Sequence, residues 1–397
     1  MINYKNFKAI DYVFSFGILA TLFTSVRLGK LPIGIGEIFI LIWMIFSLLS
    51  YVKCKIVHLN KNCSKFLVFW VIFFILLTFG TLVSNIKNYI IGGSIVYNLF
   101  AYVFSALICI IILFKDNGYI EQIMKKVVSL SFFILIFLFL WWKFVSYSFL
   151  GLMLNYGTSF TGGANNPNQL ALYMTSMPFV CLHFLKKEKF KAYKYYIYLF
   201  GSIIVGISTN SDALLVTWLI SFVVLLAFHV YKKIKAPGNI ILIFLLLSIC
   251  LVFIISFPGV SGKLSDHIDE WYHMAENGRI AIWKEGIVTV LRSPLVGHGP
   301  SGLVNLNGVL YEAHNTFIDV SIQTGLIGLC IYFYFLCTIC INVKNNSFLV
   351  ATFASIVFYS LGHFVLRQPI FWIYLIFINC SSENNDLNKI SRKCYDE

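Results

Sequence analysis

The sequence predicts an all-α protein that crosses a membrane many times, and three observations support this class. Hydrophobic residues make up 59% of the 397 residues and charged residues only 12%, whereas soluble domains are about half apolar and a quarter charged. The mean hydropathy is +0.83. The apolar residues gather in runs near the length that spans a bilayer, about 20 residues. Such runs are expected to be helical, because a bilayer offers no water to bond the backbone.

Twelve apolar runs are candidate membrane helices, and we predict a single integral membrane domain over residues 1–397. The first run is interpreted as a retained span, because no obvious small-residue cleavage site follows it. The seventh and twelfth runs are short for a span. The runs lie near residues 9–25, 32–51, 66–84, 96–114, 127–147, 169–185, 195–208, 213–231, 240–257, 316–342, 347–364 and 368–380.

The formal net charge of +13 indicates orientation in a membrane. If the N-terminus is cytoplasmic, 21 of the 30 lysines and arginines fall on the cytoplasmic side, which agrees with the positive-inside rule. These basic residues lie in short, unconnected loops, so nucleic acid is not an expected partner. The sequence therefore predicts a multi-pass protein with both termini in the cytoplasm.

Two polar stretches on the predicted outer side differ from the other loops. Residues 258–315, between the ninth and tenth runs, form a long loop that contains an apolar-periodic piece at residues 280–288. This piece is typical of a short amphipathic helix. Residues 148–168 lack charge and are rich in Gly and Asn. Loops held by a rigid scaffold often carry function, so these two stretches are the first places to look for a site.

Two residues of the long loop are candidates for chemistry. His314 stands at the start of the tenth run, where an imidazole can accept a proton near neutral pH. The alternative is a histidine that caps or hydrogen-bonds the start of the helix. Arg279 opens the amphipathic piece, and its guanidinium fork suits phosphate oxygens. The alternative for such an arginine is that it snorkels to the outer headgroups.

Other polar residues have a structural interpretation beside a functional one. Arg367, just before the last run, either binds a charged group or snorkels to the headgroups. Asp212 lies in a polar break between the seventh and eighth runs, where a tight turn is favoured and positioning of a sugar or an arginine is the alternative. Arg292 is typical of a turn. The chain has no metal-binding Asp-x-Asp pair at a span end and no phosphate-cradling motif, so we expect no metal and no cofactor.

Three stretches resemble the bacterial O-antigen polymerase and O-antigen ligase superfamily. Residues 278–283 followed by 293–299 are similar to the family's Arg-led helix and Pro…Gly-x-Gly turn. His314-Asn315, nine residues and then Gly325-Leu-Ile-Gly328 are similar to its H-N-x9-G-x-x-G signature. Residues 165–168 are similar to an Asn-Pro-Asn entry into a span. The likeness covers roughly the second half of the chain.

The resemblance implies a GT-C-like fold of about 12 transmembrane helices, with a large periplasmic loop between helices 9 and 10. It implies a metal-independent, inverting glycosyltransferase of the bacterial inner membrane, whose donor is an oligosaccharide on undecaprenyl pyrophosphate. Membrane lipid, a chain-length regulator and a flippase are the other candidate partners. By this likeness Arg279 binds pyrophosphate and His314 lies near the acceptor hydroxyl. The predicted substrate-binding residues are Arg367, Asn315, Asn168, Asp212 and Arg292.

One departure from the family pattern bears on the choice between polymerase and ligase. Ligases resemble one another in a Ser-Arg or Thr-Arg pair at the outer end of the mid-chain span, where this chain has Ser211-Asp212. A carboxylate cannot hold phosphate as an arginine does, so the polymerase is preferred over the ligase, which transfers the finished chain to lipid A-core. A flippase or transporter is the alternative of another class. It predicts charged or broken helices in mid-membrane and internal repeats, whereas the ionisable groups here gather at the outer rim.

Overall fold

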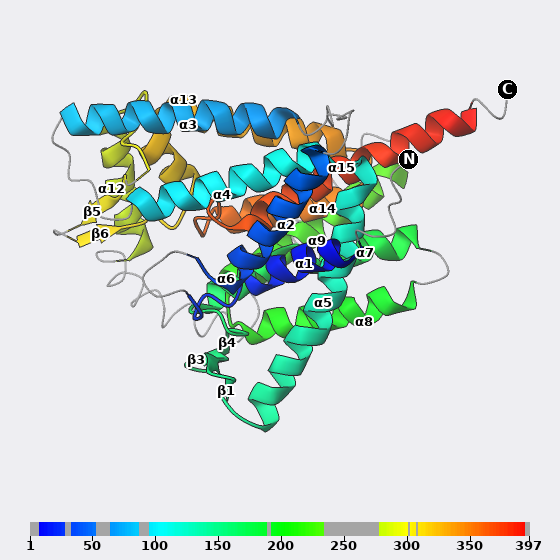
Figure 1. Cartoon of the computed structure of the whole chain (residues 1–397). Coiled ribbons are helices and arrows are strands. Elements are labelled where there is room, and N and C mark those ends of the chain that lie inside the picture. The colour runs from blue at the N-terminus through cyan, green and yellow to red at the C-terminus, as the bar shows by residue number, and fades with distance from the viewer. Residues whose placement is uncertain are drawn as a thin grey trace.

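A computed structural model describes residues 8–27, 33–52, 64–86, 95–188, 192–233, 278–300, 302–306 and 309–393. Helices dominate these residues (Figure 1), which confirms a mostly helical, multi-pass membrane protein. The ninth predicted run, 240–257, and residues 258–277 of the predicted large loop lie outside the described residues. The number of twelve membrane helices therefore stays a prediction.

Each predicted run within the described ranges corresponds to a helix or to a pair of helices. Six helices, α2, α3, α4, α5, α9 and α13, are long and apolar enough to cross a membrane, while α1, α14 and the first part of α15 are shorter apolar helices. The sixth run is divided at Ser176, because Pro178 lies in the first turn of a new helix. The bounds are α1 Lys8–Ala20, α2 Ile35–Val52, α3 Ser64–Ile86, α4 Ile95–Leu113, α5 Asn117–Phe144, α6 Pro167–Thr175, α7 Met177–Lys187, α8 Tyr193–Ser208, α9 Asp212–Lys233, α12 Arg279–Arg292, α13 Thr316–Val343, α14 Ser347–Ser360 and α15 Pro369–Lys393.

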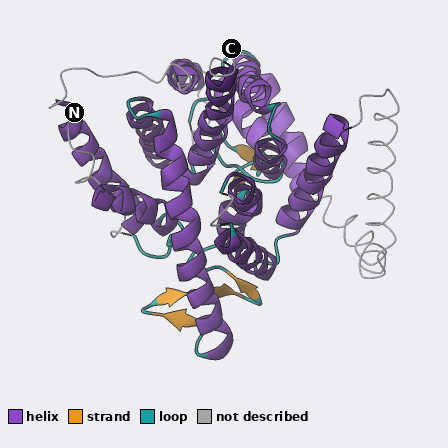
Figure 2. Ribbon diagram, turned by 90° about the vertical axis from the view of Figure 1, so that its right-hand side faces the viewer, coloured by secondary structure: helices purple, strands orange, loops and turns teal. Residues whose placement is uncertain are grey.

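The predicted polar loops contain short β-ribbons that the sequence analysis did not anticipate. The first two ribbons pair β1 (Ser148–Phe149) with β2 (Leu152–Met153) and β3 (Asn155–Tyr156) with β4 (Ser159–Phe160); they lie at the end of α5 (Figure 2). The third pairs β5 (Val304–Leu306) with β6 (Val309–Tyr311). In the first ribbon Leu150 and Gly151 both have positive φ, 49° and 83°, as a tight two-residue hairpin turn requires.

The helix α15 forms the centre of the described bundle. Every residue from 370 to 378 is at most 3% exposed, and a helix that is apolar all round belongs in an interior. Trp372 packs on Trp70 with ring centroids 4.4 Å apart, and α15 contacts α4, α5, α13 and α14. Arg367, which directly precedes this helix, is therefore held close to the core.

Charged side chains divide the bundle into two ends. At one end, which we call the basic end, ion pairs join α1, α5 and α7: Lys126–Asp11 at 2.9 Å and Lys187–Glu121 at 2.6 Å. The opposite end, which we call the loop end, carries residues 148–166, 209–211, 293–300, 302–306, 309–315 and 361–368. Between the ends, large apolar side chains such as Phe79, Phe137 and Phe222 are about half exposed, which suits a surface that faces lipid tails.

The long helix α13 is broken at Gly325, whose φ of 69° and ψ of −173° lie outside the helical region. Residues 294–299, which follow α12, fill the break. In this loop the carbonyl oxygen of Pro294 accepts from the N–H of Leu326 (2.7 Å). The N–H groups of the next-to-last and last residues of the loop, His298 and Gly299, donate to the carbonyl oxygens of Ile322 (2.8 Å) and Gln323 (2.9 Å). The backbone groups freed by the break are thus bonded within the protein, as a membrane interior demands.

The filling loop is held in place by His298, which is 2% exposed. Its Nε2 lies 2.9 Å from the carbonyl oxygen of Thr289 in α12, and its own carbonyl oxygen accepts from Ser84 Oγ at 2.9 Å. Gly297 and Gly299, on either side of it, have φ of 69° and 81°. The two signature-like stretches 293–299 and 325–328 therefore form one interlocked structural unit.

Candidate functional site

The amphipathic helix predicted around residues 280–288 exists as α12 and packs on α13 and β5. Ile282 and Val290 share a small apolar cluster with Val304 and Ile322. Trp283 Nε1 donates to the carbonyl oxygen of Ala313 at 2.9 Å. Because Trp283 lies one turn after the first residue of α12, this bond brings the start of α12 to the loop that carries His314.

Arg279 is the first residue of α12 and is exposed. Its side chain makes no hydrogen bond or ion pair with any other described residue, although its charge acts on His314, His363 and Tyr359. A positive charge at a helix N-terminus interacts unfavourably with the helix dipole, so Arg279 does not stabilise α12 through its charge. Its guanidinium and the helix N-terminus together form a positive place that suits an anion.

His314 lies immediately before the N-cap of α13 in a strained backbone conformation, with φ of 51°. Histidine is among the residue types that occur in this region more often than most. The capping role considered for His314 belongs to Asn315, whose Oδ1 accepts from the N–H groups of Phe317 (3.0 Å) and Ile318 (3.3 Å). The side chain of Asn315, 8% exposed, is therefore engaged by the helix, while His314 keeps part of its surface open to solvent.

Asp319, a residue that the sequence analysis missed, holds the backbone on both sides of His314. It is buried, and its carboxylate accepts from the N–H of Ala313 at 3.0 Å and from the N–H of Asn315 at 3.4 Å. The sequence shows an acidic residue in the first turn of a helix, a position that the helix dipole favours. It does not show that this residue contacts the backbone around His314, because that contact depends on the geometry of the turn. We interpret Asp319 as a positioning residue for His314.

His363 is the second histidine of the site, and it comes from the segment after α14. Thr316 Oγ1 donates to the carbonyl oxygen of His363 at 2.6 Å and accepts from the N–H of Val365 at 3.1 Å. The imidazole stacks on Tyr359, with ring centroids 4.7 Å apart. Its Nε2 is buried and makes no hydrogen bond with the described residues. The sequence alone gives His363 no role, because no motif surrounds it.

Arg367 forms a half-buried link between three segments. Its Nη2 donates to both carboxylate oxygens of Glu312, at 2.6 and 2.7 Å, and its Nη1 donates to Asn98 Oδ1 at 2.8 Å. Asn98 in turn donates to the carbonyl oxygen of Pro300 at 2.7 Å. Arg367 thus ties the loop before His314 to α4 and to the start of α15. We name Arg279, Glu312, His314, His363 and Arg367 the His314 cluster.

The environment of His314 favours the neutral imidazole. Partial burial is the largest influence and lowers the pKa of His314. Glu312 raises that pKa, while the positive charges of Arg279 and Arg367 lower it, and the net direction is downward. The ordinary pKa of histidine is about 6.5, so the ring is neutral at pH 7 and able to accept a proton.

Asn168 and Asp212 lie at the loop end near the cluster. The carbonyl oxygen of Asn168 accepts from Tyr359 Oη at 2.7 Å, and its Oδ1 accepts from Ser211 Oγ at 3.1 Å. Asp212 follows Ser211 as the first residue of α9, where an acidic side chain suits the helix dipole. It is exposed and makes no hydrogen bond or ion pair with another described residue. The tight turn expected there is present, with φ of 51° at Asn210.

Arg292 is not brought to the cluster. It ends α12, about 20 Å along the helix from Arg279 at 1.5 Å per residue. Its side chain is half exposed and pairs with Glu285 at 3.3 Å. Arg292 therefore lies at the opposite end of α12 from Arg279, paired within its own helix and away from His314, so the predicted substrate-binding role of Arg292 beside His314 is not supported.

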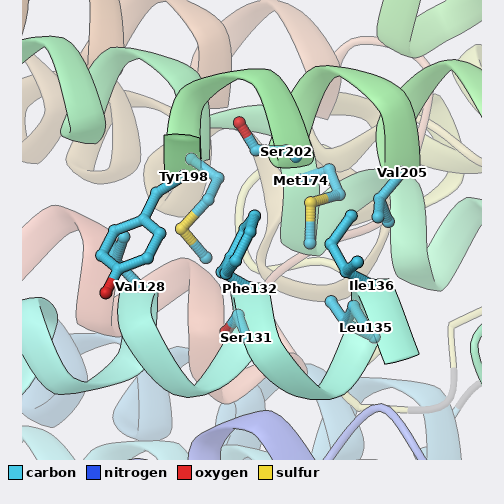
Figure 3. Close-up of a pocket in the computed structure, with 11 residues that line it drawn as sticks. Val128, Ser131, Phe132, Leu135, Ile136, Met174, Tyr198, Ser202 and Val205 are labelled. Carbon is cyan, nitrogen blue, oxygen red and sulfur yellow. The ribbon is translucent and has the colours of Figure 1, made fainter. Parts of the chain in front are cut away.

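The cavities between the described residues differ greatly in size and lining. A polar cavity of about 280 Å³ adjoins Glu312 and Arg367. A much smaller one, about 10 Å³, lies between α5, α6, α7 and α8 (Figure 3); it is lined by apolar side chains such as Phe132 and Met174 and has no room for a substrate. The described residues contain no group of three or more His, Cys, Asp or Glu side chains close enough to bind a metal ion.

Comparison with known proteins confirms the resemblance over part of the chain. Residues 197–333, about a third of the sequence, match the family described as O-Antigen ligase. No curated protein matches the chain. The matched segment includes Asp212, Arg279, His314 and Asn315, whereas Asn168, His363 and Arg367 lie outside it. The match supports the O-antigen polymerase and ligase superfamily without separating its two activities.

Proposed function

We propose, from the family match of residues 197–333 and from the His314 cluster, that this protein is an O-antigen or related surface polysaccharide polymerase. It is an inverting, GT-C-like glycosyltransferase of the bacterial inner membrane that joins repeat units carried on undecaprenyl pyrophosphate. The observation that carries the proposal is that His314, in a turn whose backbone is held by Asp319, lies within electrostatic reach of Arg279, an exposed arginine that makes no hydrogen bond or ion pair with another described residue. The loop end faces the periplasm, because the basic end is the cytoplasmic one by the positive-inside rule.

The chemistry follows from these two groups. His314 takes the proton of the acceptor hydroxyl, whose oxygen bonds to the anomeric carbon of the donor glycan. The bond between that carbon and the pyrophosphate oxygen breaks, and undecaprenyl pyrophosphate leaves with the electron pair. Arg279 and the N-terminus of α12 stabilise the charge that develops on the leaving group. The acceptor attacks from the side opposite the leaving group, so the anomeric configuration inverts.

The ligase is the second candidate, since the family match does not separate the two activities. Purified protein in liposomes is given radiolabelled lipid-linked repeat units, with and without lipid A-core. A polymerase yields a ladder of longer lipid-linked glycans in both mixtures. A ligase transfers label only when lipid A-core is present. Absence of any new glycosidic bond in both mixtures would contradict the enzymatic proposal.

A transporter is a weaker candidate than either enzyme. It predicts broken helices, and α13 is broken at Gly325. In transporters, however, such breaks bind the substrate or the coupling ion, whereas here the loop of residues 294–299 fills the break. The charged residues of the His314 cluster lie at the loop end, where the chain leaves the bilayer.

A pH prediction follows from the lowered pKa of His314. A base with a lowered pKa keeps its neutral, active form to more acidic pH than an ordinary histidine, so kcat/KM should fall in acid with a midpoint below pH 6.5. Glu312→Gln removes an influence that raises the pKa and should move the midpoint to lower pH. Arg279→Gln removes one that lowers the pKa and should move the midpoint of the residual activity to higher pH.

The measurement is the initial rate of glycan elongation against pH at low substrate concentration, at matched protein levels. Glu285→Gln is the control, because that carboxylate lies on α12 and pairs with Arg292; it should leave the midpoint unchanged. A midpoint that fails to move in opposite directions in the Glu312 and Arg279 variants would mean that another group titrates.

A further inference from the structure

We propose that the polar cavity beside Glu312 and Arg367 binds an uncharged sugar residue of the glycan and selects the repeat unit. This inference rests on the proposed function and names the part of the substrate that the cavity contacts. The cavity has a volume of about 280 Å³, close to the lower end of small-ligand sites. It therefore accommodates part of a glycan and not a whole repeat unit.

The cavity adjoins the reacting groups through Glu312. This residue lines the cavity, lies two positions before His314 in the chain, and its charge acts on His314. The rest of the lining comes from residues 21–27 after α1, from the start of α2, from α4 and from the starts of α6 and α15. A glycan that reacts at His314 can thus extend into the cavity.

The lining has the chemistry that a sugar requires. The carboxylate of Glu37 and the amide groups of Gln169 and Gln368 offer acceptors and donors for hydroxyl groups. The aromatic rings of Tyr97 and Phe100 line the same cavity, and such flat apolar faces suit the C–H face of a sugar ring. Glu37 and Gln169 each accept one hydrogen bond from the protein, from Gly34 N–H and Thr24 Oγ1. A lipid tail would offer no partner to the remaining donors and acceptors of the lining, at a cost in free energy.

The charges in the lining favour an uncharged ligand. Two arginines are balanced by two carboxylates, and each guanidinium already has a partner. Arg367 is paired with Glu312 at 2.6 Å. Arg27 donates to Tyr97 Oη at 3.1 Å and lies over that ring at 5.5 Å. A pyrophosphate or a uronic acid would face Glu37 and Glu312, and an ammonium sugar would face the two arginines, so each would lose affinity.

The residues that line the cavity and the residues that act in the reaction come from different parts of the chain. Among the lining residues, only Glu312 belongs to the segment that matches the family, 197–333. The matched segment holds Arg279 and His314, which act on groups common to all substrates of this chemistry. The cavity comes almost entirely from the remainder of the chain, and it is there that selectivity for a particular glycan resides.

Photocrosslinking tests where the sugar binds. p-Benzoylphenylalanine replaces Phe100 in the cavity or, as a reference, Ile280 beside Arg279, and full-length protein in liposomes receives lipid-linked repeat units of its own bacterium labelled in the sugar. Mild acid then cleaves the sugar–pyrophosphate bond, so label stays on the protein only if the glycan itself is crosslinked. We expect acid-stable label from both positions.

The outcomes separate this inference from the proposed function. Acid-stable label from position 280 but none from position 100 overturns the sugar cavity and leaves the enzyme intact. Label at position 100 that is lost in acid means that the cavity holds the lipid carrier, which also overturns it. Absence of label at both positions, together with absence of elongation, contradicts the proposed function itself.

A matched pair of variants on α4 gives an independent measurement. Ala101 lines the cavity, while Val103 on the same helix is 43% exposed on the outer face. Ala101→Phe should fill the cavity and raise KM for the lipid-linked unit at least about tenfold, equivalent to 1.4 kcal/mol, with kcat much less affected. Val103→Phe adds the same side chain and should leave both constants unchanged. An unaltered KM in folded Ala101→Phe overturns the inference.

Discussion

Replacing His314 with asparagine should lower kcat by about 10²–10⁴-fold, the usual contribution of a general base. Asparagine is the informative choice, because it tolerates the positive φ of 51° at this position. The hydrogen bonds from Ala313 and Asn315 to Asp319 are made by the backbone, so they survive the substitution. The loss should therefore reflect the missing imidazole and not a collapsed turn.

The measurement is single-turnover elongation of labelled lipid-linked repeat units by purified protein. His229→Asn is the matched control, since His229 is an exposed histidine on α9, far along that helix from the loop end; it should elongate at the wild-type rate. If His314→Asn retained wild-type kcat, the base would have to be another group, and His363 would be the next residue to test.

Replacing Gly325 with alanine or asparagine should destabilise the protein by about 1–3 kcal/mol from backbone strain alone, with overlap adding to this. The pair of φ 69° and ψ −173° belongs to a region that is essentially restricted to glycine, so asparagine should give no rescue. A side chain here would also collide with the backbone of Leu295 and Val296 in the filling loop. We expect a lower Tm, less protein in the membrane and no polymer.

Gly118→Ala is the matched control for this pair of variants. Gly118 lies in the first turn of α5 with no atom within 4 Å of an added Cβ, and alanine is the better helix former. Its Tm should stay at or slightly above that of the wild type. A Gly325→Ala protein with unchanged Tm and activity would mean that α13 can close its break without losing the bundle.

Most of the helices could be predicted from the sequence, because the length of an apolar run is enough to identify a membrane helix. It also identified the start of α12 and the segment around His314 as the place to look. It did not predict the break in α13. The glycines at 297, 299, 325 and 328 were noticed as a signature, but their purpose depends on contacts between α12, its loop and α13.

The residues that sequence reasoning missed share one property: their role is set by distant segments. Glu312 matters because Arg367, from the start of α15, pairs with it. His363 matters because Thr316 and Tyr359 place it near Arg279. For Arg367, the alternative of binding a charged group was predicted, but Glu312 could not be named as that group from the sequence. Local periodicity cannot reveal such pairings, since it reports only which face of a single helix is apolar.

The interlock between residues 294–299 and α13 has a consequence for biogenesis. The loop is synthesised before the helix whose break it fills, and the bonded groups of Pro294 and Leu326 are close in the chain. The break leaves unpaired amides and carbonyls that a lipid environment cannot solvate, so the second half of α13 cannot settle stably in the bilayer until the loop is already seated. Stable insertion of this helix is thus coupled to docking of the loop that precedes it.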